Sequence, residues 1–473
     1  MKLETPFNSK MYKRVLFILV VIFILTLPVP QSAAAQSGGP VYIVQAGDTL
    51  SNIALRFNVS LDELLAANPS IDPNFLSEGQ QIVIPGLEGI SGVLETEVIP
   101  FGDSLRSLSR RTQVSDEQLI QLNRIVSPTE LYVGISMIVP VREGQLQYNS
   151  RTSAATGESL LEVAVIQGSD PWTLSSINKL VGTWDTLPND VLYSPTGNGE
   201  GGTGLPSAFI SANINPLPMI QGGTEVLRVQ VKDGYAVSGM LVDRPLRFFP
   251  SNGGQVALQG VHALLDTGVY PLRVEATLPD GTRQSYEQMV LVASGNYYSE
   301  DLIVEPATID PAVTEPENQQ VYSITSLVTG TKYWDDRFAS PAIYPDQYTS
   351  LYGTRRTYKG LNSDLTATGF HTGLDFAGGE GLQIFAPAPG QVVFSGALTV
   401  RGNATIIDHG WGVYSGFWHQ SVSYVSVGDF VEQGQVIGLV GGTGRVTGPH
   451  LHWEVWVNGV QVNPLDWLNQ AYP

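Results

Sequence analysis

The sequence predicts a multidomain protein of three α+β repeats, a β-sandwich-like middle domain and a strand-rich C-terminal domain. A set of positions recurs every 55 residues, as at Gly47, Gly102 and Gly157, which indicates a repeated unit. Apolar residues alternate along the middle of the chain, and five of the six histidines lie in its last quarter. The 50 glycines and 30 prolines favour short strands and turns, and the absence of cysteine excludes disulfides.

The N-terminus has the features of a secretory signal. Lys10, Lys13 and Arg14 precede an apolar run that ends before the small residues 32–35. This order of charge, apolar core and small-residue site predicts a signal peptide at 1–35. The protein is therefore expected to be extracytoplasmic, secreted or periplasmic, and to touch a membrane only if the segment is kept as an anchor.

The repeated units cover 40–86, 94–142 and 152–196. Each is predicted to fold as strand, helix, helix, strand, and in the first unit Asp48 or Thr49 is expected to cap the first helix. Further positions keep the same step, namely Leu50, Leu105 and Leu160; Leu64, Leu119 and Leu174; Asn68, Asn123 and Asn178; and Pro85, Pro140 and Pro195.

These units resemble the LysM module, a family that binds glycans containing N-acetylglucosamine, such as peptidoglycan, through the loops that flank its helices. The first copy is a close match and the third is degenerate, so that the third is either a binding unit or a structural spacer. The resemblance suggests five glycan-binding candidates in the first copy, which are Gly47, Asp48, Thr49, Asn68 and Pro69.

Residues 207–298 are expected to form an immunoglobulin-like β domain, acting as a spacer or as a cover for a site. Strands are predicted at Val226–Val231 and Tyr270–Ala276, and Pro279–Thr282 is a strong hairpin turn. The acidic, proline-containing stretch 299–340 is predicted to be a linker.

The C-terminal histidines form a candidate metal site. His371 and Asp375 are followed by His419, and then by His450 and His452. Imidazole and carboxylate are the usual ligands of catalytic zinc, which keeps one position open for water or substrate. Side chains alternate along a strand, so His450 and His452 point the same way, and one can bind metal while the other acts on substrate.

The stretch 341–473 resembles the lysostaphin-type zinc metallopeptidases, which are bacterial cell-wall endopeptidases. The motifs that carry the resemblance are Tyr348–Arg356, Phe370–Gly378, Ala386–Gly390, Ile407–Gly410, Gly434–Gly438 and Thr443–His452.

The resemblance implies a mostly antiparallel β catalytic domain, with one zinc ion at the floor of a groove. His371, Asp375 and His452 would bind the zinc. His419 and His450 would be catalytic, and would orient or deprotonate the attacking water and stabilise the oxyanion. Glu454 and His409 are interpreted as structural, and His262 as an ordinary surface or core residue.

The predicted function is zinc-dependent cleavage of amide bonds in the peptide cross-links of peptidoglycan, with the LysM repeats as wall anchors. The formal charge of −19 argues against a nucleic-acid partner. One alternative is a non-hydrolytic wall-binding regulator that activates an amidase. Another is a latent enzyme whose zinc is covered by an upstream segment.

Overall fold

The computed structural model describes residues 39–87, 89–127, 130–142, 150–188, 190–194 and 204–473. The expected signal peptide lies outside these residues. They form two compact units. The first contains the described residues up to Glu95 together with Pro140–Arg142, and the second contains the remaining described residues. Within the described part of the chain, no helix is long and apolar enough to cross a membrane.

The first repeat has the predicted order of elements. Strand β1 (Val41–Ile43) precedes helices α2 (Leu50–Phe57) and α3 (Leu61–Ala67), and β2 (Gln81–Val83) returns antiparallel to β1. Thr49 caps α2 by accepting a hydrogen bond from the Asn52 amide. Of the two residues expected to cap this helix, Thr49 is therefore the one that does so.

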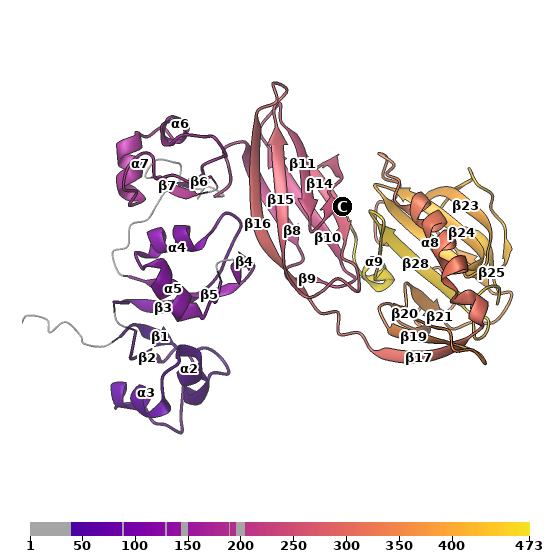
Figure 1. Ribbon diagram of the computed structural model, residues 1–473, viewed down its shortest axis with the longest axis horizontal. Coiled ribbons are helices and arrows are strands. Elements are labelled where there is room, and N and C mark those ends of the chain that lie inside the picture. The colour runs from indigo at the N-terminus through magenta and orange to yellow at the C-terminus, as the bar shows by residue number, and fades with distance from the viewer. Residues whose placement is uncertain (1–38, 88, 128–129, 143–149, 189, 195–203) are drawn as a thin grey trace, which may run out of the picture. The chain divides into compact units, whose positions relative to one another are not determined.

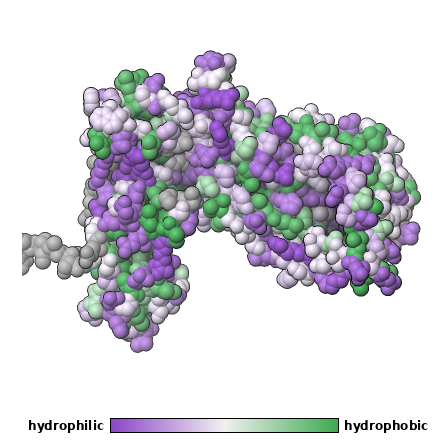
Figure 2. All heavy atoms as spheres, viewed as in Figure 1, coloured by the Kyte–Doolittle hydropathy of each residue, from purple (hydrophilic) through white to green (hydrophobic). Residues whose placement is uncertain are grey.

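The second and third repeats follow the same plan. The second contains β3 (Val93–Val98), α4 (Leu105–Thr112), α5 (Asp116–Asn123), β4 (Tyr132–Val133) and β5 (Ser136–Val141). The third contains β6 (Ser150–Ser153), α6 (Leu160–Ile166), α7 (Pro171–Ile177) and β7 (Val191–Ser194). Helix α6 leaves Leu161, Val165 and Ile166 exposed, and Figure 2 shows hydrophobic residues gathered over this part of the third repeat.

The recurring asparagine has a structural role, which corrects the interpretation of Asn68 as a glycan-binding residue. Its amide donates to Leu64 O and Val83 O at 2.8 and 2.7 Å, and its oxygen accepts from Val83 N at 2.8 Å. Asn123 and Asn178 make the same set of bonds in their repeats. Asn68 is also only 7% exposed, and both N–H bonds of its amide are used to join the second helix to the closing strand.

The middle region consists of two sheets around one core. One sheet has the order β13 (Phe248–Ser251), β14 (Gly254–Gly260), β10 (Thr224–Val231) and β8 (Phe209–Asn215). The other has the order β12 (Arg244–Pro245), β11 (Ala236–Leu241), β15 (Gly268–Thr277), β16 (Arg283–Ala293) and β4, with β9 (Met219–Ile220) also pairing with β16. Leu227, Ala257, Leu272 and Val290 belong to the shared core. The two predicted strands lie in β10 and β15, and the predicted turn joins β15 to β16.

The structure differs from the prediction at 299–340, where an acidic linker was expected. Strand β17 (Ser299–Val304) pairs in parallel with β19 (Arg355–Gly360), which pairs with β20 (Thr366–Phe370). A 3-10 turn, η2 (Pro306–Thr308), then leads into helix α8 (Pro311–Thr325). The prolines of this stretch suggested a linker, but Pro311 occupies the first turn of α8, where a missing N–H costs nothing.

Helix α8 packs on one face of the C-terminal sheet (Figure 1). Val321 lies in a cluster with Ile406, Tyr414, Trp418 and Trp456, which come from three strands of that sheet. Its acidic residue Glu317 is 6% exposed. The helix is thus held by tertiary contacts that composition alone does not reveal.

The C-terminal domain is a ten-stranded sheet whose described pairings are all antiparallel, as expected. Its main path runs through β18 (Tyr348–Ser350), β21 (Leu374–Phe376), β28 (Leu451–Val457), β25 (Val413–Ser423), β24 (Gly402–Gly410), β23 (Gly390–Leu398) and β26 (Phe430–Val431). Off this path lie β22 (Gln383–Phe385), β27 (Val436–Val440) and β29 (Val460–Val462), and the chain continues into α9 (Pro464–Asn469).

The middle region contributes to the core of this domain. Val226, Phe249 and Leu258 belong to the same buried cluster as the C-terminal strands, and Phe249 stacks on Trp411 with ring centroids 4.8 Å apart. Trp467 in α9 also donates from Nε1 to Thr224 Oγ1 at 3.2 Å. The C-terminal domain therefore shares a core with the β region before it.

Candidate active site

Neighbouring strands bring the predicted metal ligands together. Asp375 in β21 lies directly opposite His452 in β28, and His371 follows the end of β20. The loop between His371 and Asp375 passes close to β28, because a Cβ on Gly373 would lie 2.3 Å from Trp453 O. Glycine is needed there for the loop to approach the strand.

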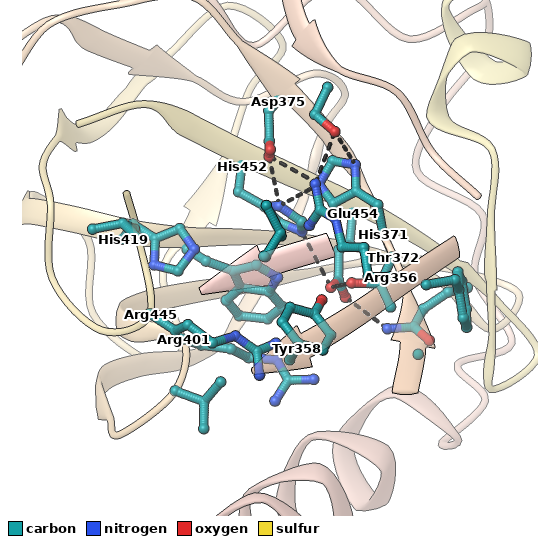
Figure 3. A pocket seen from close by; sticks show the side chains of 18 of the residues that line it. Arg356, Tyr358, His371, Thr372, Asp375, Arg401, His419, Arg445, His452 and Glu454 are labelled. Atoms are coloured by element: carbon teal, nitrogen blue, oxygen red, sulfur yellow. Dashed lines mark hydrogen bonds and ion pairs between the residues drawn. The ribbon is translucent and has the colours of Figure 1, made fainter. Parts of the chain in front are cut away.

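Three side-chain atoms of these residues converge (Figure 3). His371 Nε2 lies 3.0 Å from Asp375 Oδ1, and His452 Nδ1 lies 2.7 Å from the same oxygen. The two imidazole nitrogens are 3.1 Å apart. All three residues are buried, with exposed fractions of 1% for His371 and 7% for the other two.

This donor set fits a metal ion. Two imidazole nitrogens and one carboxylate oxygen are the ligands of many catalytic metal sites, and metal–ligand distances near 2.0–2.2 Å place tetrahedral donors roughly 3.3 Å apart. The atoms of His371, Asp375 and His452 need to separate by about 0.2–0.6 Å to reach that spacing. Burial favours the neutral form of Asp375, but His371 and His452 outweigh it and hold the pKa of Asp375 well below its usual range.

The predicted catalytic histidines lie beside this cluster. His419 forms a second possible metal-holding group with His450 and His452, and its ring centroid is 5.2 Å from that of His450. His419 Nδ1 lies 2.8 Å from Thr443 O, and His450 Nδ1 lies 2.8 Å from Gly448 O. Because each Nδ1 faces a main-chain carbonyl, the hydrogen bond places the proton there and leaves Nε2 as an acceptor.

His419 has an unusual backbone conformation. Its φ of +64° lies in the left-handed region, within strand β25, where the register with β24 shifts. Such a bulge re-aims a side chain at the cost of local strain, and it is common beside active sites. Burial, followed by the charges of His452 and His450, lowers the pKa of His419 to about 3, so its ring is neutral near pH 7.

Glu454 has a role that the sequence did not reveal. Its Oε1 lies 3.3 Å from His452 Nε2, and its Oε2 accepts from Trp456 Nε1 at 2.8 Å and Gln461 Nε2 at 3.2 Å. Thr372 Oγ1 also donates to Oε1. A carboxylate on the outer nitrogen of a ligating histidine fixes the tautomer that binds metal. The available signal was its place two residues beyond His452, on the same face of β28.

Two other histidines can be compared with their predictions. His409 is fully buried, with Nδ1 2.8 Å from Pro389 O and Nε2 2.9 Å from Ser415 Oγ, in agreement with a structural role. His262, interpreted as an ordinary surface or core residue, is half-buried and lines the groove, where its ring meets Phe370 edge-on at 5.2 Å.

The metal cluster opens into a groove of about 850 Å³. One wall comes from the C-terminal sheet and the loop before β28. Other lining residues belong to segments that precede this sheet, including Arg244, Leu302, Ile309 and Asn318. Segments far apart in the sequence therefore shape the space in front of the metal ligands.

In the first repeat, four of the five glycan-binding candidates remain available. Asp48 accepts hydrogen bonds from Tyr42 and Gln45, and it precedes the capping residue Thr49 on the exposed turn between β1 and α2. Gly47 in this turn has a φ of +84°, and Pro69 is exposed after α3. Asn68 is the candidate that the fold uses for its own core.

Family models match two parts of the chain. Residues 369–464 match peptidase family M23, and residues 42–85 and 99–140 match the LysM domain. The first match contains all five clustered metal and catalytic candidates. The third repeat lies outside the LysM matches.

Several known proteins are similar to the C-terminal part. The DD-carboxypeptidase/endopeptidase Mpg of Neisseria meningitidis is 45% identical over 125 residues, which are 26% of this chain and 27% of that protein. The peptidoglycan DD-endopeptidase ShyC of Vibrio cholerae is 43% identical over 94 residues, or 20% of this chain and 22% of that protein. The chain thus spans about a quarter of the length of these curated relatives.

Solved structures show the same similarity. A peptidase M23 from Pseudomonas aeruginosa aligns at 26% identity with a TM-score of 0.40, covering 54% of this chain and 96% of that one. The catalytic domain of lysostaphin from Staphylococcus simulans aligns at 34% identity with a TM-score of 0.21, covering 21% and 80%. From the family matches and the clustered ligands, the chain carries a C-terminal domain of peptidase family M23 preceded by LysM domains.

Proposed function

We propose that the protein is a zinc-dependent endopeptidase that cuts amide bonds in the peptide cross-links of peptidoglycan, with LysM repeats that hold it on the wall glycan. The observation that carries the proposal is the convergence of His371, Asp375 and His452, with His419 and His450 beside them in one groove. The similarity to Mpg, a DD-carboxypeptidase/endopeptidase, and to ShyC, a peptidoglycan DD-endopeptidase, supports the same reaction class.

His371, Asp375 and His452 would hold the zinc. Bound there, zinc supplies a Lewis acid for the scissile carbonyl and for the attacking water. His419 presents Nε2 as a neutral acceptor, because its Nδ1 is engaged by Thr443 O, and it takes a proton from that water. The water oxygen first adds to the carbonyl carbon to give a tetrahedral species, and when its C–N bond then breaks the protonated imidazole gives the proton to the departing amine.

His450 lines the same groove, and its ring centroid is 5.2 Å from that of His419. Its Nδ1 is engaged by Gly448 O, and its Nε2 is 3.5 Å from Asp375 Oδ1. When protonated, it donates from Nε2 to the oxyanion of the tetrahedral species. The two histidines therefore divide proton transfer and charge stabilisation between them.

The N-terminal half is proposed to hold the enzyme on its substrate. The first repeat would bind glycan through the exposed turn of Gly47, Asp48 and Thr49 together with Pro69. We assign the third repeat to the LysM type from its strand–helix–helix–strand order, and the middle region to an immunoglobulin-like sandwich from its two sheets. Residues 1–35 would direct export to the wall, where tandem modules extend residence on a polymer.

The test is mass spectrometry of the fragments that the purified full-length protein releases from peptidoglycan. The full chain is used because strands of the middle region belong to the core of the C-terminal domain. We expect new peptide ends, lost on treatment with a chelator, restored by zinc and absent with His371→Ala. Zinc-loaded, folded protein that releases no fragment would refute the endopeptidase and favour the amidase-activating regulator.

A further inference from the structure

The groove carries a cluster of positive charge in an acidic protein. Arg356, Arg401 and Arg445 all line it, although the chain as a whole has a formal charge of −19. Figure 3 shows Arg401 and Arg445 close together on the side of the groove that also holds Tyr358. The general composition of the chain does not account for this concentration of guanidinium groups.

Two of the three arginines are neutralised by acidic residues from the segment before the C-terminal sheet. Arg356 donates from Nε to Glu300 Oε1 at 2.7 Å. Arg401 donates from Nη1 to Glu317 Oε1 at 3.0 Å, and its guanidinium lies over the ring of Trp418. These pairs fasten β17 and α8 beside the groove.

Arg445 differs from the other two. Its guanidinium donates from Nη1 to Thr308 O at 3.0 Å and lies 4.4 Å from the centre of the Tyr358 ring. Among the residues that the structure describes, no carboxylate lies within 4 Å of it. Burial lowers the pKa of Arg445, and the charges of Arg401 and Arg356 act in the same direction, against the opposing effects of Tyr358 and the more distant Glu317.

The loop that carries Arg445 is fixed in position. The Arg445 amide donates to Val400 O at 2.8 Å. Gly444 precedes it with a φ of +77°, and a Cβ there would lie 2.5 Å from both Gly402 N and Val400 O. A guanidinium that is held in place and still has N–H donors can bind a planar anion through a bidentate hydrogen bond.

We propose that Arg445 binds a free carboxylate of the substrate peptide, in the same groove as the metal ligands. A peptide carries such groups at its C-terminus and on acidic side chains, and a carboxylate supplies the charge that Arg445 lacks. The Tyr358 ring holds the guanidinium in place. Because Arg445 would favour peptides that carry a carboxylate at this position, it would be a specificity-determining residue. This inference rests on the proposed peptidase function.

The test compares two cross-linked peptides that differ only in one group, a free carboxylate or its carboxamide, at each candidate position near the scissile bond. The variant is Arg445→Gln, and Arg355→Gln is its matched control, because Arg355 is exposed on β19 and does not line the groove. We expect Arg445→Gln to lower kcat/KM about 10- to 100-fold for the carboxylate peptide at one position. The carboxamide value should change little, and Arg355→Gln should change neither.

Two results would overturn the proposal. An equal loss on both peptides would mean that Arg445 acts only by holding Thr308 and the segment around it. Wild-type protein that cleaves every carboxylate and carboxamide pair at equal rates would show that no carboxylate is selected.

A binding measurement separates this proposal from the proposed function. If wild-type protein cleaves none of the peptides, the peptidase proposal fails, and the titration of metal-free protein with an acetylated dipeptide and its carboxamide decides the role of Arg445. Chemical shifts of the arginine Nε–H groups should change on adding the acid and change less on adding the amide. The affinity of Arg445→Gln for the acid should be at least 10-fold lower than that of the wild type. Equal affinity of the variant and the wild type for the acid would overturn the proposal.

Discussion

Glu454→Gln is a nearly isosteric change that tests how the proposed metal ligand His452 is held. Oε1 of Glu454 faces His452 Nε2 and the Thr372 hydroxyl, whereas Oε2 receives hydrogen bonds from Trp456 and Gln461. Every neighbour can be served by the carboxylate acting as an acceptor. Although burial favours its neutral form, the hydrogen bonds from His452 and Thr372 and the charges of Arg401 and His452 lower the pKa of Glu454 to about 2, so it is ionised at neutral pH.

A glutamine cannot satisfy both sides of this position. If its NH2 group faces Trp456 and Gln461, the N–H donors of these three side chains meet without an acceptor, which costs about 1–3 kcal/mol of stability. If its amide group faces His452 instead, Nε2 must accept and the proton moves to Nδ1, the atom directed at Asp375 and the metal position. The first arrangement also leaves His452 with a neutral acceptor in place of a charged one, and the second moves its proton, so either weakens metal binding by about 10- to 100-fold or 1.4–2.7 kcal/mol.

The measurement is a competition titration of metal-free protein with zinc and a chromophoric chelator, together with urea unfolding of the metal-free form. Thr372→Val is the matched control, because it removes one donor to Glu454 and leaves the carboxylate in place. We expect a larger loss of zinc affinity for Glu454→Gln than for this control. Unchanged zinc affinity in folded Glu454→Gln protein would refute the idea that Glu454 sets the tautomer of His452.

Four further predictions address other parts of the fold. Gly373→Ala places a Cβ 2.7 Å from His452 Nε2, so we expect zinc affinity to fall at least 10-fold in the same titration. Glu317→Ala leaves two main-chain amides without their acceptor and the buried charge of Arg401 without its carboxylate, with only Asn318 Oδ1 still accepting from Nη1, and should lower the free energy of urea unfolding by about 3 kcal/mol. Asn68→Ala removes three hydrogen bonds inside the first repeat, and should make that repeat sensitive to limited proteolysis before the rest of the chain. Burial lowers the pKa of His409 to about 4 from its ordinary 6.5, so the unfolded state binds more protons between these values; stability should fall by up to about 3 kcal/mol as pH drops from 6.5 to 4, and His409→Gln should flatten this dependence in urea unfolding.

The grouping of the candidate metal ligands could be predicted from the sequence because its signal lies in residue types and short spacings. Histidine is rare in this chain, and alternation along a strand places His450 and His452 on one face. The pairing of Asp375 with His452 depends on strand register, and it follows from the order β21 beside β28. The left-handed backbone of His419 had no such signal, because a bulge is specified by the neighbouring strands rather than by the histidine itself.

Other features escaped prediction for different physical reasons. Asn68 looked available because its recurrence in each repeat suits both a binding residue and an internal hydrogen-bonding one. The stretch 299–340 looked like a linker because it is acidic and contains several prolines. The buried positions of α8, which are Glu317, Val321 and Thr325, are spaced by four residues and form one narrow face. A buried glutamate on that face hides the pattern, because its burial depends on Arg401 far along the chain.

The division of the groove between matched and unmatched parts of the chain bears on how this protein selects its substrate. All five metal and catalytic candidates lie within residues 369–464, the part that matches the M23 family. Much of the lining in front of them comes from outside that range, including Arg244, His262, Glu300, Asn318 and Arg356. The candidate reactive groups therefore lie within the matched domain, whereas much of the groove wall in front of them lies outside it. Under the proposed function, substrate preference should follow these walls rather than the candidate metal ligands.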